Sequence, residues 1–311
     1  MNVPHLHLLL NHFPTIGTII GLGLLFAARM TRGDELRRAG LTVFFGLSVI
    51  AIPTYLTGNA ADRTIDGLAG VSLDAITRHE DAAIPAFLLM ELTGGLAWLA
   101  LWQYRRLGRF VSGTETAVLV LALATFGFMS RAATLGGEIR HPEIFEEGAV
   151  RAEAGSGWFS ASRIDTFVTD NAWVWPTSEA IHFVGLCVLV GIVLLINLRL
   201  LGWLRAVPLA SLHRLLPFGV LAFGLNALSG MLFFVAAPEQ YSDNVTFYWK
   251  ILFILIAAAV LFYVTVFEQA WEIDAGREAP VLSKAVAVCA IVAWVGVIYC
   301  GQMLPFLGNA F

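Results

Sequence analysis

Eight apolar stretches of similar length recur along this 311-residue chain, and they limit what it can fold into more than any other feature. A helix that crosses a bilayer needs about 20 mostly apolar residues, and each stretch comes close to that length. The stretches cover residues 9–29, 40–58, 83–103, 114–134, 179–198, 215–236, 246–267 and 284–305. Because 58% of the residues are hydrophobic and only 14% are charged, the sequence predicts an all-α integral membrane protein with eight transmembrane helices.

The charges between these stretches are unevenly distributed. The connections after the first, third, fifth and seventh stretches carry the basic residues Arg29, Arg32, Arg37, Arg38, Arg105, Arg106, Arg109, Arg199, Arg205, Arg214, Arg277 and Lys284. Short cytoplasmic loops are enriched in Lys and Arg, so these connections are expected in the cytoplasm and both termini on the outer face of a bacterial inner membrane. The membrane lipid is then the partner of the apolar helix surfaces. With 19 basic against 23 acidic residues, the chain lacks the basic surface that nucleic-acid binding requires.

One connection, about residues 135–178, is long, acidic and contains the segment GSGWFSASR. Connections of this length are uncommon inside a compact domain, so it divides the chain into two four-helix bundles. We expect a first membrane domain at 1–142, an acidic outer-face connection at 143–178 and a second membrane domain at 179–311. The two halves do not look like copies of each other, which argues against a transporter built from inverted repeats.

Histidines gather at one face of the predicted membrane domain. The topology places His5, His7, His12, His79, His141 and His182 near the outer face and His213 alone on the cytoplasmic side. His12 and His79 open two spans that run in the same direction and should be diagonal neighbours in a four-helix bundle. Two axial imidazoles held across such a core are the ligands that a haem requires. The alternative for each histidine is an ordinary half-hydrated residue at the membrane interface.

Other chemistry-bearing residues are fewer. Glu91 lies about two turns into the third apolar stretch, where it either acts as a proton relay or quinone contact or forms a plain interhelical hydrogen bond. The cysteines Cys187, Cys289 and Cys300 lie within apolar stretches and form no C-x-x-C or C-x-x-C-H pattern, which excludes a zinc ribbon and covalent c-type haem attachment.

The first half contains motifs in a recognisable order. His7 and His12-Phe13-Pro14 open the chain, Gly58 closes the second span, His79 opens the third, and the segment 136–141, GGEIRH, follows the fourth. Over residues 5–142 this pattern resembles the bacterial membrane family called domain of unknown function 2231, which usually opens with H-P-x-x-x-H-F-P. The chain departs from that pattern at Leu8 and by one extra residue between the histidines.

The resemblance implies a four-helix membrane module associated with haem or redox chemistry. The second half loosely resembles another uncharacterised bacterial membrane family, with His182 and Arg199 at its marked positions. The sequence therefore predicts a cytochrome-b-like electron-transfer subunit that binds haem b through His12 and His79 and works with a respiratory or periplasmic redox protein. One haem is favoured over two. If a second haem is bound, His182 and His141 are the remaining candidate ligands. The alternatives are a non-catalytic membrane scaffold and a copper or zinc site built from His7, His12, His79 and His141.

Overall fold

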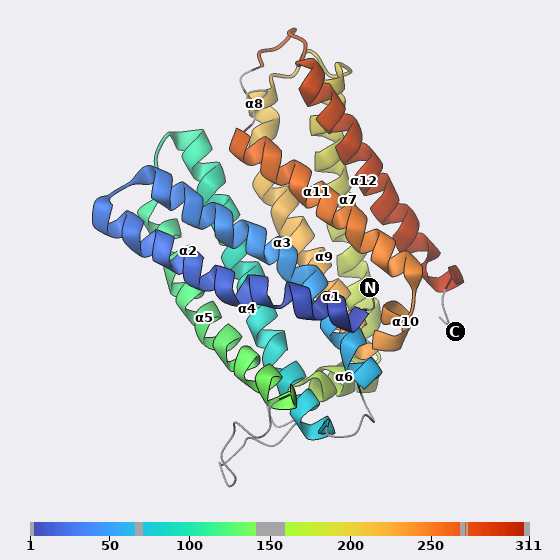
Figure 1. The fold of residues 1–311 in the computed structure, drawn as a ribbon. Helices are drawn as coiled ribbons and strands as arrows, with labels where there is room; N and C mark the ends of the chain where they lie inside the picture. The colour runs from blue at the N-terminus through green and yellow to red at the C-terminus, as the bar shows by residue number, and fades with distance from the viewer. Residues whose placement is uncertain (1–2, 66–70, 141–158, 268–270, 272, 308–311) are drawn as a thin grey trace. The chain divides into compact units, whose positions relative to one another are not determined.

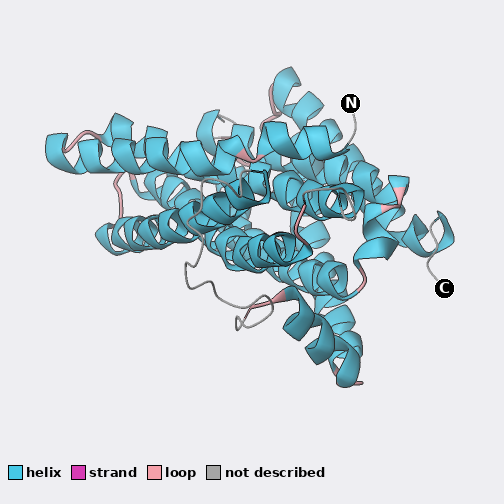
Figure 2. Ribbon diagram, turned by 60° about the horizontal axis from the view of Figure 1, so that its bottom comes forward, coloured by secondary structure: helices cyan, strands magenta, loops and turns pink. Residues whose placement is uncertain are grey.

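The computed structural model describes residues 3–65, 71–140, 159–267, 271 and 273–307. Within those ranges every regular element is a helix (Figures 1 and 2). Eight helical stretches in the described part are long and apolar enough to cross a membrane: 3–31, 34–65, 73–107, 112–139, 174–201, 209–236, 245–265 and 281–304. The prediction of an all-helical protein with eight helices long and apolar enough to cross a membrane is confirmed for the described residues.

The chain separates into two compact units, Met1–Phe167 and Val168–Phe311. Their boundary falls within α6 (Ala161–Asp170), a short helix of the connection that the sequence places at 143–178. Each unit contains four of the eight long apolar stretches. The two units are described separately below.

Unit 1 is built from α1 (Val3–Leu10), α2 (His12–Thr31), α3 (Asp34–Ile65), α4 (Leu73–Leu107) and α5 (Ser112–Arg140). The first two form one span that is interrupted at Asn11 (Figure 1). Helices α2 and α4 each pack against both α3 and α5, and α1 packs against α3. The first and third spans therefore lie at opposite corners of this unit.

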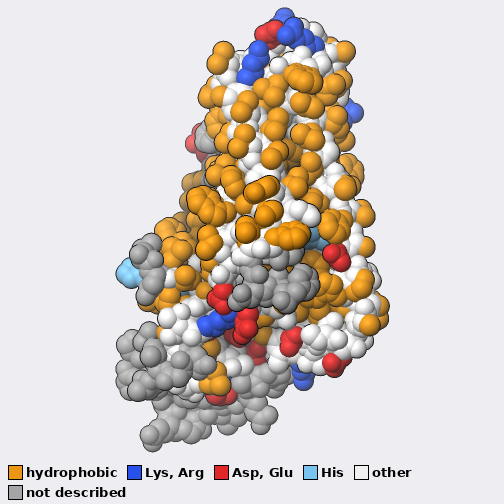
Figure 3. Space-filling model, turned by 90° about the vertical axis from the view of Figure 1, so that its right-hand side faces the viewer, with side chains coloured by type: hydrophobic (Ala, Val, Ile, Leu, Met, Phe, Trp, Pro, Cys, Tyr) orange, Lys and Arg blue, Asp and Glu red, His pale blue; other side chains and the backbone are white. Residues whose placement is uncertain are grey.

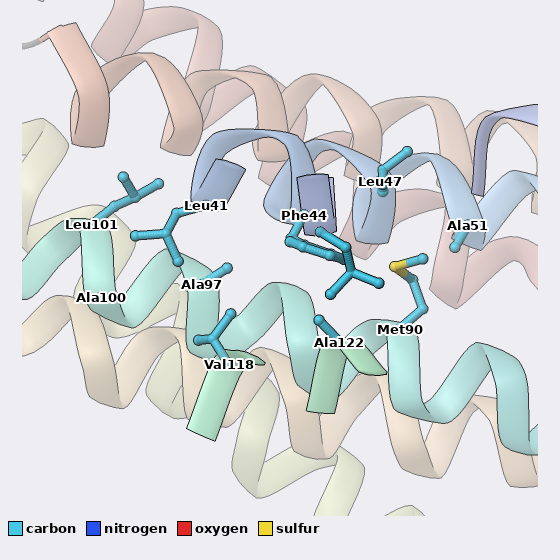
Figure 4. Close-up of a cluster of buried hydrophobic side chains, with 11 residues drawn as sticks. Leu41, Phe44, Leu47, Ala51, Met90, Ala97, Ala100, Leu101, Val118 and Ala122 are labelled. Carbon is cyan, nitrogen blue, oxygen red and sulfur yellow. The ribbon is translucent and has the colours of Figure 1, made fainter. Parts of the chain in front are cut away.

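The core of unit 1 combines large apolar side chains with small ones. Leu41 and Phe44 of α3 meet Met90 of α4 and Val118 of α5, and all four are buried (Figure 4). Alanines complete the cluster at Ala51, Ala97, Ala100 and Ala122. Small residues let helix backbones approach closely, which is how helices associate in lipid.

Local signals explain where several helices begin and end. Ser72 caps α4, since its side chain accepts a hydrogen bond from the backbone N–H of Ala75 at 3.4 Å. Gly108 ends α4 and Gly202 ends α7 in the left-handed conformation, which glycine adopts without steric cost. Such caps allow tight connections between antiparallel spans.

Unit 2 contains α7 (Val174–Leu201), α8 (Leu209–Leu212), η2 (His213–Leu215), α9 (Leu216–Ala236), α10 (Pro238–Ser242), α11 (Val245–Phe267) and α12 (Val281–Leu307). Helix α7 packs against α9 and α12, and α12 packs also against α11. The side chain of Arg199, at the end of α7, is fully buried and donates to the carbonyls of Val207, Asp274 and Arg277. This arginine joins the connections at one end of the unit.

The surface fits a lipid environment. Figure 3 shows one face on which hydrophobic side chains cover the long helices, while Lys and Arg side chains gather at one end. Large apolar side chains such as Phe183, Val184 and Val292 are exposed on these helices. In water such a surface would be costly, whereas in a bilayer it contacts acyl chains.

Candidate functional site

His7 is fixed against the next span by a hydrogen bond and by a glycine. Its Nδ1 lies 2.9 Å from the backbone oxygen of Thr54 on α3. A Cβ atom at Gly58, one turn further along α3, would lie 3.0 Å from Cε1 of the imidazole. The bare glycine therefore provides the surface on which this partly buried ring rests.

His79 makes the same arrangement with α5. Its Nδ1 lies 2.9 Å from the backbone oxygen of Ala132. A Cβ atom at Gly136, again one turn further along, would lie 3.0 Å from Cε1. The two imidazoles of unit 1 are thus held by the same pair of contacts, each to a different helix.

These hydrogen bonds fix which ring nitrogen carries the proton. A carbonyl oxygen can only accept, so Nδ1 of His7 and Nδ1 of His79 must both donate. In the neutral ring, Nε2 is then left with its lone pair. Among the residues that the structure describes, neither Nε2 has a hydrogen-bond partner. Ligand histidines typically present a free nitrogen and donate the other N–H to a carbonyl.

The two imidazoles lie at the same end of unit 1, since each is near the start of its span. They belong to the first and third spans, which occupy opposite corners of unit 1. Each imidazole presents one Nε2 lone pair to a possible ligand.

His12, which the sequence pairs with His79, lies elsewhere. It is exposed, and its Nδ1 lies 3.0 Å from the carbonyl of Leu8 in the preceding turn. His5 is exposed as well. The structure therefore gives His7, rather than His12, the same contacts as His79.

Polar residues lie next to Gly58 and His79 along α3 and α4. Asn59 of α3 donates to Oε1 of Glu80 at 3.1 Å, and the carboxylate of Glu80 acts on that of Asp62. Asp81 accepts a hydrogen bond from the backbone N–H of Ala161 at 3.1 Å. These hydrogen bonds join α3 to α4 and α4 to α6 at this end of unit 1.

A buried ion pair lies next to His79. Arg78 donates to Oε1 of Glu138 on α5 at 3.0 Å, and both side chains are buried. Arg78 also contacts the carboxylate of Asp74 at 3.1 Å. The ion pair and the hydrogen bond of His79 both link α4 to α5. The ion pair therefore helps to hold α4 and α5 in the alignment that places the imidazole against Ala132.

Glu91 is separate from this group. It lies twelve residues further along α4 than His79, which is about 18 Å at 1.5 Å per residue. Its Oε1 is buried and has no hydrogen-bond partner within the described residues. The structure therefore gives no support for the interhelical hydrogen bond that is one of the two expectations for Glu91.

The remaining candidates are distributed over the chain. His182 lies in unit 2 and His141 falls outside the described residues. His213 is buried and packs edge-on against Trp271, with ring centroids 4.5 Å apart. Over the ranges that the structure covers, no group of three or more His, Cys, Asp or Glu side chains is suited to hold a metal ion.

Comparison of the chain with protein-family models, curated proteins and solved structures yields no match. The resemblance of the first half to the domain of unknown function 2231 family stays a prediction based on its motifs. The function is therefore argued from the site itself.

Sequence reasoning identified the histidines and glycines of the site but not their pairing. In the sequence, Gly58 and His79 indicate only where one span ends and another begins. In the structure, Gly58 contacts His7 and Gly136 contacts His79. A histidine near the start of one span followed by a glycine near the end of the next is the signal that could have revealed the contacts.

Proposed function

We propose that unit 1 binds haem b between His7 and His79 and that the protein serves in electron transfer. The observation that carries the proposal is the pair of Nδ1 hydrogen bonds to the carbonyls of Thr54 and Ala132, 2.9 Å each, which leaves both Nε2 lone pairs available. The proposal keeps His79 from the sequence prediction and replaces His12 by His7.

The residues present fit the group. His7 and His79 would hold the iron through Nε2, and their Nδ1–H donors would fix the ring orientation and raise ligand basicity. Gly58 and Gly136 leave room for the rings themselves, since a Cβ atom at either glycine would lie only 3.0 Å from Cε1 of its imidazole. A haem iron with two imidazole ligands supplies one-electron transfer when bound.

Three half-buried carboxylates lie near the proposed haem site. Asp62, Glu80 and Asp81 lie at the same end of unit 1 as the imidazoles. A periplasmic or membrane redox protein with a basic docking face would be complementary to them. The proposed setting is a bacterial inner membrane, where the chain would serve as a subunit or partner of a respiratory complex.

An absorption spectrum of the full-length protein, purified in detergent from haem-replete cells, tests the proposal. We expect a low-spin Soret band in the wild type, and its loss or conversion to a five-coordinate form in His7→Ala and His79→Ala. Free imidazole should restore the low-spin spectrum by filling the vacated position. His12→Ala is the matched control, since its exposed ring bonds within its own helix, and it should keep the wild-type spectrum.

The opposite results are equally informative. If His12→Ala abolishes the band while His7→Ala retains it, the pairing of His12 with His79 is the correct one. If the wild type never carries haem but binds copper or zinc in a metal analysis, a metal site replaces the haem site. If it carries neither, a membrane scaffold becomes the better description.

A further inference from the structure

A small cavity lies between three helices of unit 1, at the end opposite His7 and His79. It has a volume of about 40 Å³ and is lined by Leu25 and Arg29 of α2, Arg37 of α3, and Glu115 and Leu119 of α5. Helix α2 packs against both α3 and α5, so the cavity lies where the three helices meet. Since about 10–15 Å³ holds one water molecule, there is room for about three oxygen-sized groups.

The lining of the cavity is arranged in two layers. Arg29 lies in the last turn of α2, and Glu115 lies in the first turn of α5. Leu25 and Leu119 lie four residues deeper in the same helices, which is about 6 Å at 1.5 Å per residue. The cavity is therefore polar at the end of the unit and apolar one turn further along the spans. A phospholipid has the same order, with a charged headgroup above an acyl chain.

The apolar layer is fixed by packing and continues along the surface. A Cβ atom at Gly40 of α3 would lie 2.9 Å from Cδ2 of Leu25, so this leucine rests on the bare glycine. Leu25 and Leu119 both pack against the buried core of unit 1. Leu123, one turn beyond Leu119 on α5, is exposed. An acyl chain that leaves the cavity can therefore follow an apolar path along α5.

Arg37 is held in position by three contacts. Its Nη1 donates to Asp34 at 2.9 Å, and its Nε lies 3.2 Å from Oε1 of Glu115. The guanidinium carbon lies 5.9 Å from the centre of the ring of Phe110. Within the described ranges, Nη2 has no hydrogen-bond or ion-pair partner. A preorganised guanidinium with unused N–H donors is well suited to bind a phosphate group.

Arg29 adds a second guanidinium. Its side chain is exposed, and it forms no hydrogen bond or ion pair with any residue that the structure describes. Two arginines and one glutamate line the cavity, so its net charge is positive. The neighbouring connections add to this charge, since the arginines Arg32, Arg38, Arg105, Arg106 and Arg109 outnumber the carboxylates Asp34 and Glu35.

We propose that this cavity binds the phosphate group of an anionic phospholipid. Arg29 and Nη2 of Arg37 would donate to the phosphate oxygens, and an acyl chain would lie against Leu119 and Leu123. Basic pockets between transmembrane helices bind the headgroups of anionic lipids. A zwitterionic lipid fits less well because it adds a cation beside two arginines. A soluble phosphate would leave the leucine layer without a contact.

Native mass spectrometry of the full-length protein tests the proposal. The protein would be stripped of lipid in detergent and titrated with dioleoylphosphatidylglycerol, and the dissociation constant of the first bound lipid would be measured. We expect Arg29→Gln to weaken binding at least tenfold, because it removes a charged donor. Arg105→Gln is the matched control and should bind within twofold of the wild type. It removes an exposed arginine at the same end, on α4, which lies diagonally opposite α2.

A pair of variants that keeps the charge tests whether the lipid enters the cavity. Leu119→Trp should fill the cavity and weaken binding at least tenfold. Val120→Trp places the same ring on the exposed surface of α5 and should bind like the wild type. Equal binding by Leu119→Trp and the wild type would show that charge alone holds the lipid at the surface, and the cavity site would be wrong.

Two measurements on the wild type do not depend on the folding of any variant. Dioleoylphosphatidylcholine should bind at least tenfold more weakly than dioleoylphosphatidylglycerol, and equal binding would overturn the proposal. Inorganic phosphate at millimolar concentration should not displace the lipid, and displacement would show a site for a soluble anion instead. The test is independent of the haem proposed for the other end of unit 1, whose spectrum Arg29→Gln should leave unchanged.

Discussion

The imidazole of His79 rests directly on Gly136, where an added Cβ atom would lie 3.0 Å from Cε1. That separation is tighter than an ordinary van der Waals contact, so a methyl group there must displace the ring by a few tenths of an ångström. We predict that Gly136→Ala disturbs the hydrogen bond from Nδ1 to Ala132 and shifts or broadens the low-spin haem spectrum of the proposed site. The absorption spectrum of the purified variant provides the measurement.

The next residue offers a matched control for this prediction. Gly137 has no atom within 4 Å of its would-be Cβ, so Gly137→Ala should leave the spectrum unchanged. Equal spectra for the wild type and both variants would show that the glycine contact does not position the imidazole.

A similar pair of glycines tests the packing of unit 1. A Cβ atom at Gly94 would collide with Oγ of Ser48 and would lie 3.2 Å from the backbone oxygen of Phe44, whereas Gly95 faces open space. Forcing extra atoms into a packed core costs about 1 to 3 kcal/mol, so Gly94→Ala should lower the free energy of unfolding by about that amount. Gly95→Ala should be neutral or stabilising by up to about 1 kcal/mol. Unfolding in mixed detergent micelles would measure both, and a Gly95→Ala variant as unstable as Gly94→Ala would refute the close contact.

The positions of the spans could be predicted because length and hydropathy largely determine them. The helices extend beyond the apolar stretches: α3 covers 34–65 where the apolar stretch covers 40–58. Polar residues near the membrane surface continue the helix because backbone hydrogen bonds still favour it there. The apolar stretch therefore gives the membrane-buried part of a helix rather than its full length.

The pairing of side chains could not be predicted in the same way. His7 and His12 are five residues apart, so on a continuous helix they would point about 140° away from each other. Which of them faces the interior depends on the rotation of the span and on the break at Asn11 between α1 and α2. The rotation of the span and the break in it both result from packing against α3. Hydropathy carries no information about that packing. The sequence does not predict the contact of Lys250 with Gly301 either. A lysine near the end of an apolar stretch is typical of an interfacial side chain that reaches toward water.

Arg199 should be a main determinant of the stability of unit 2. Its guanidinium donates to the carbonyls of Val207, Asp274 and Arg277 at 2.5 to 3.2 Å. A buried carbonyl that loses its partner costs about 1 to 3 kcal/mol, so Arg199→Met should reduce the free energy of unfolding by about 3 kcal/mol or more. Thermal unfolding of the detergent-solubilised protein, followed by circular dichroism, measures the change.

Arg205 provides the comparison for that variant. It lies in the connection after α7, and its exposed side chain forms a 2.8 Å ion pair with the exposed Glu278. Exposed ion pairs contribute about 0 to 1 kcal/mol, so Arg205→Met should have a much smaller effect. Equal losses in the two variants would contradict the role assigned to the buried guanidinium.

Glu278, in the connection between α11 and α12, should titrate below the ordinary range of a glutamate. The hydrogen bond from Lys284, 3.0 Å long, the charge of Lys284 and the charge of Arg205 lower the pKa of Glu278. Because the pKa is lower in the folded state, these ion pairs stabilise the fold above the unfolded-state pKa of about 4.3. Their contribution is lost as the pH falls through the lowered folded-state pKa. Carbon-13 NMR of the labelled carboxyl should give a wild-type midpoint below 4.5, with a larger upward shift in Lys284→Met than in Arg205→Met. A wild-type midpoint at or above that value would show that neither ion pair forms in solution.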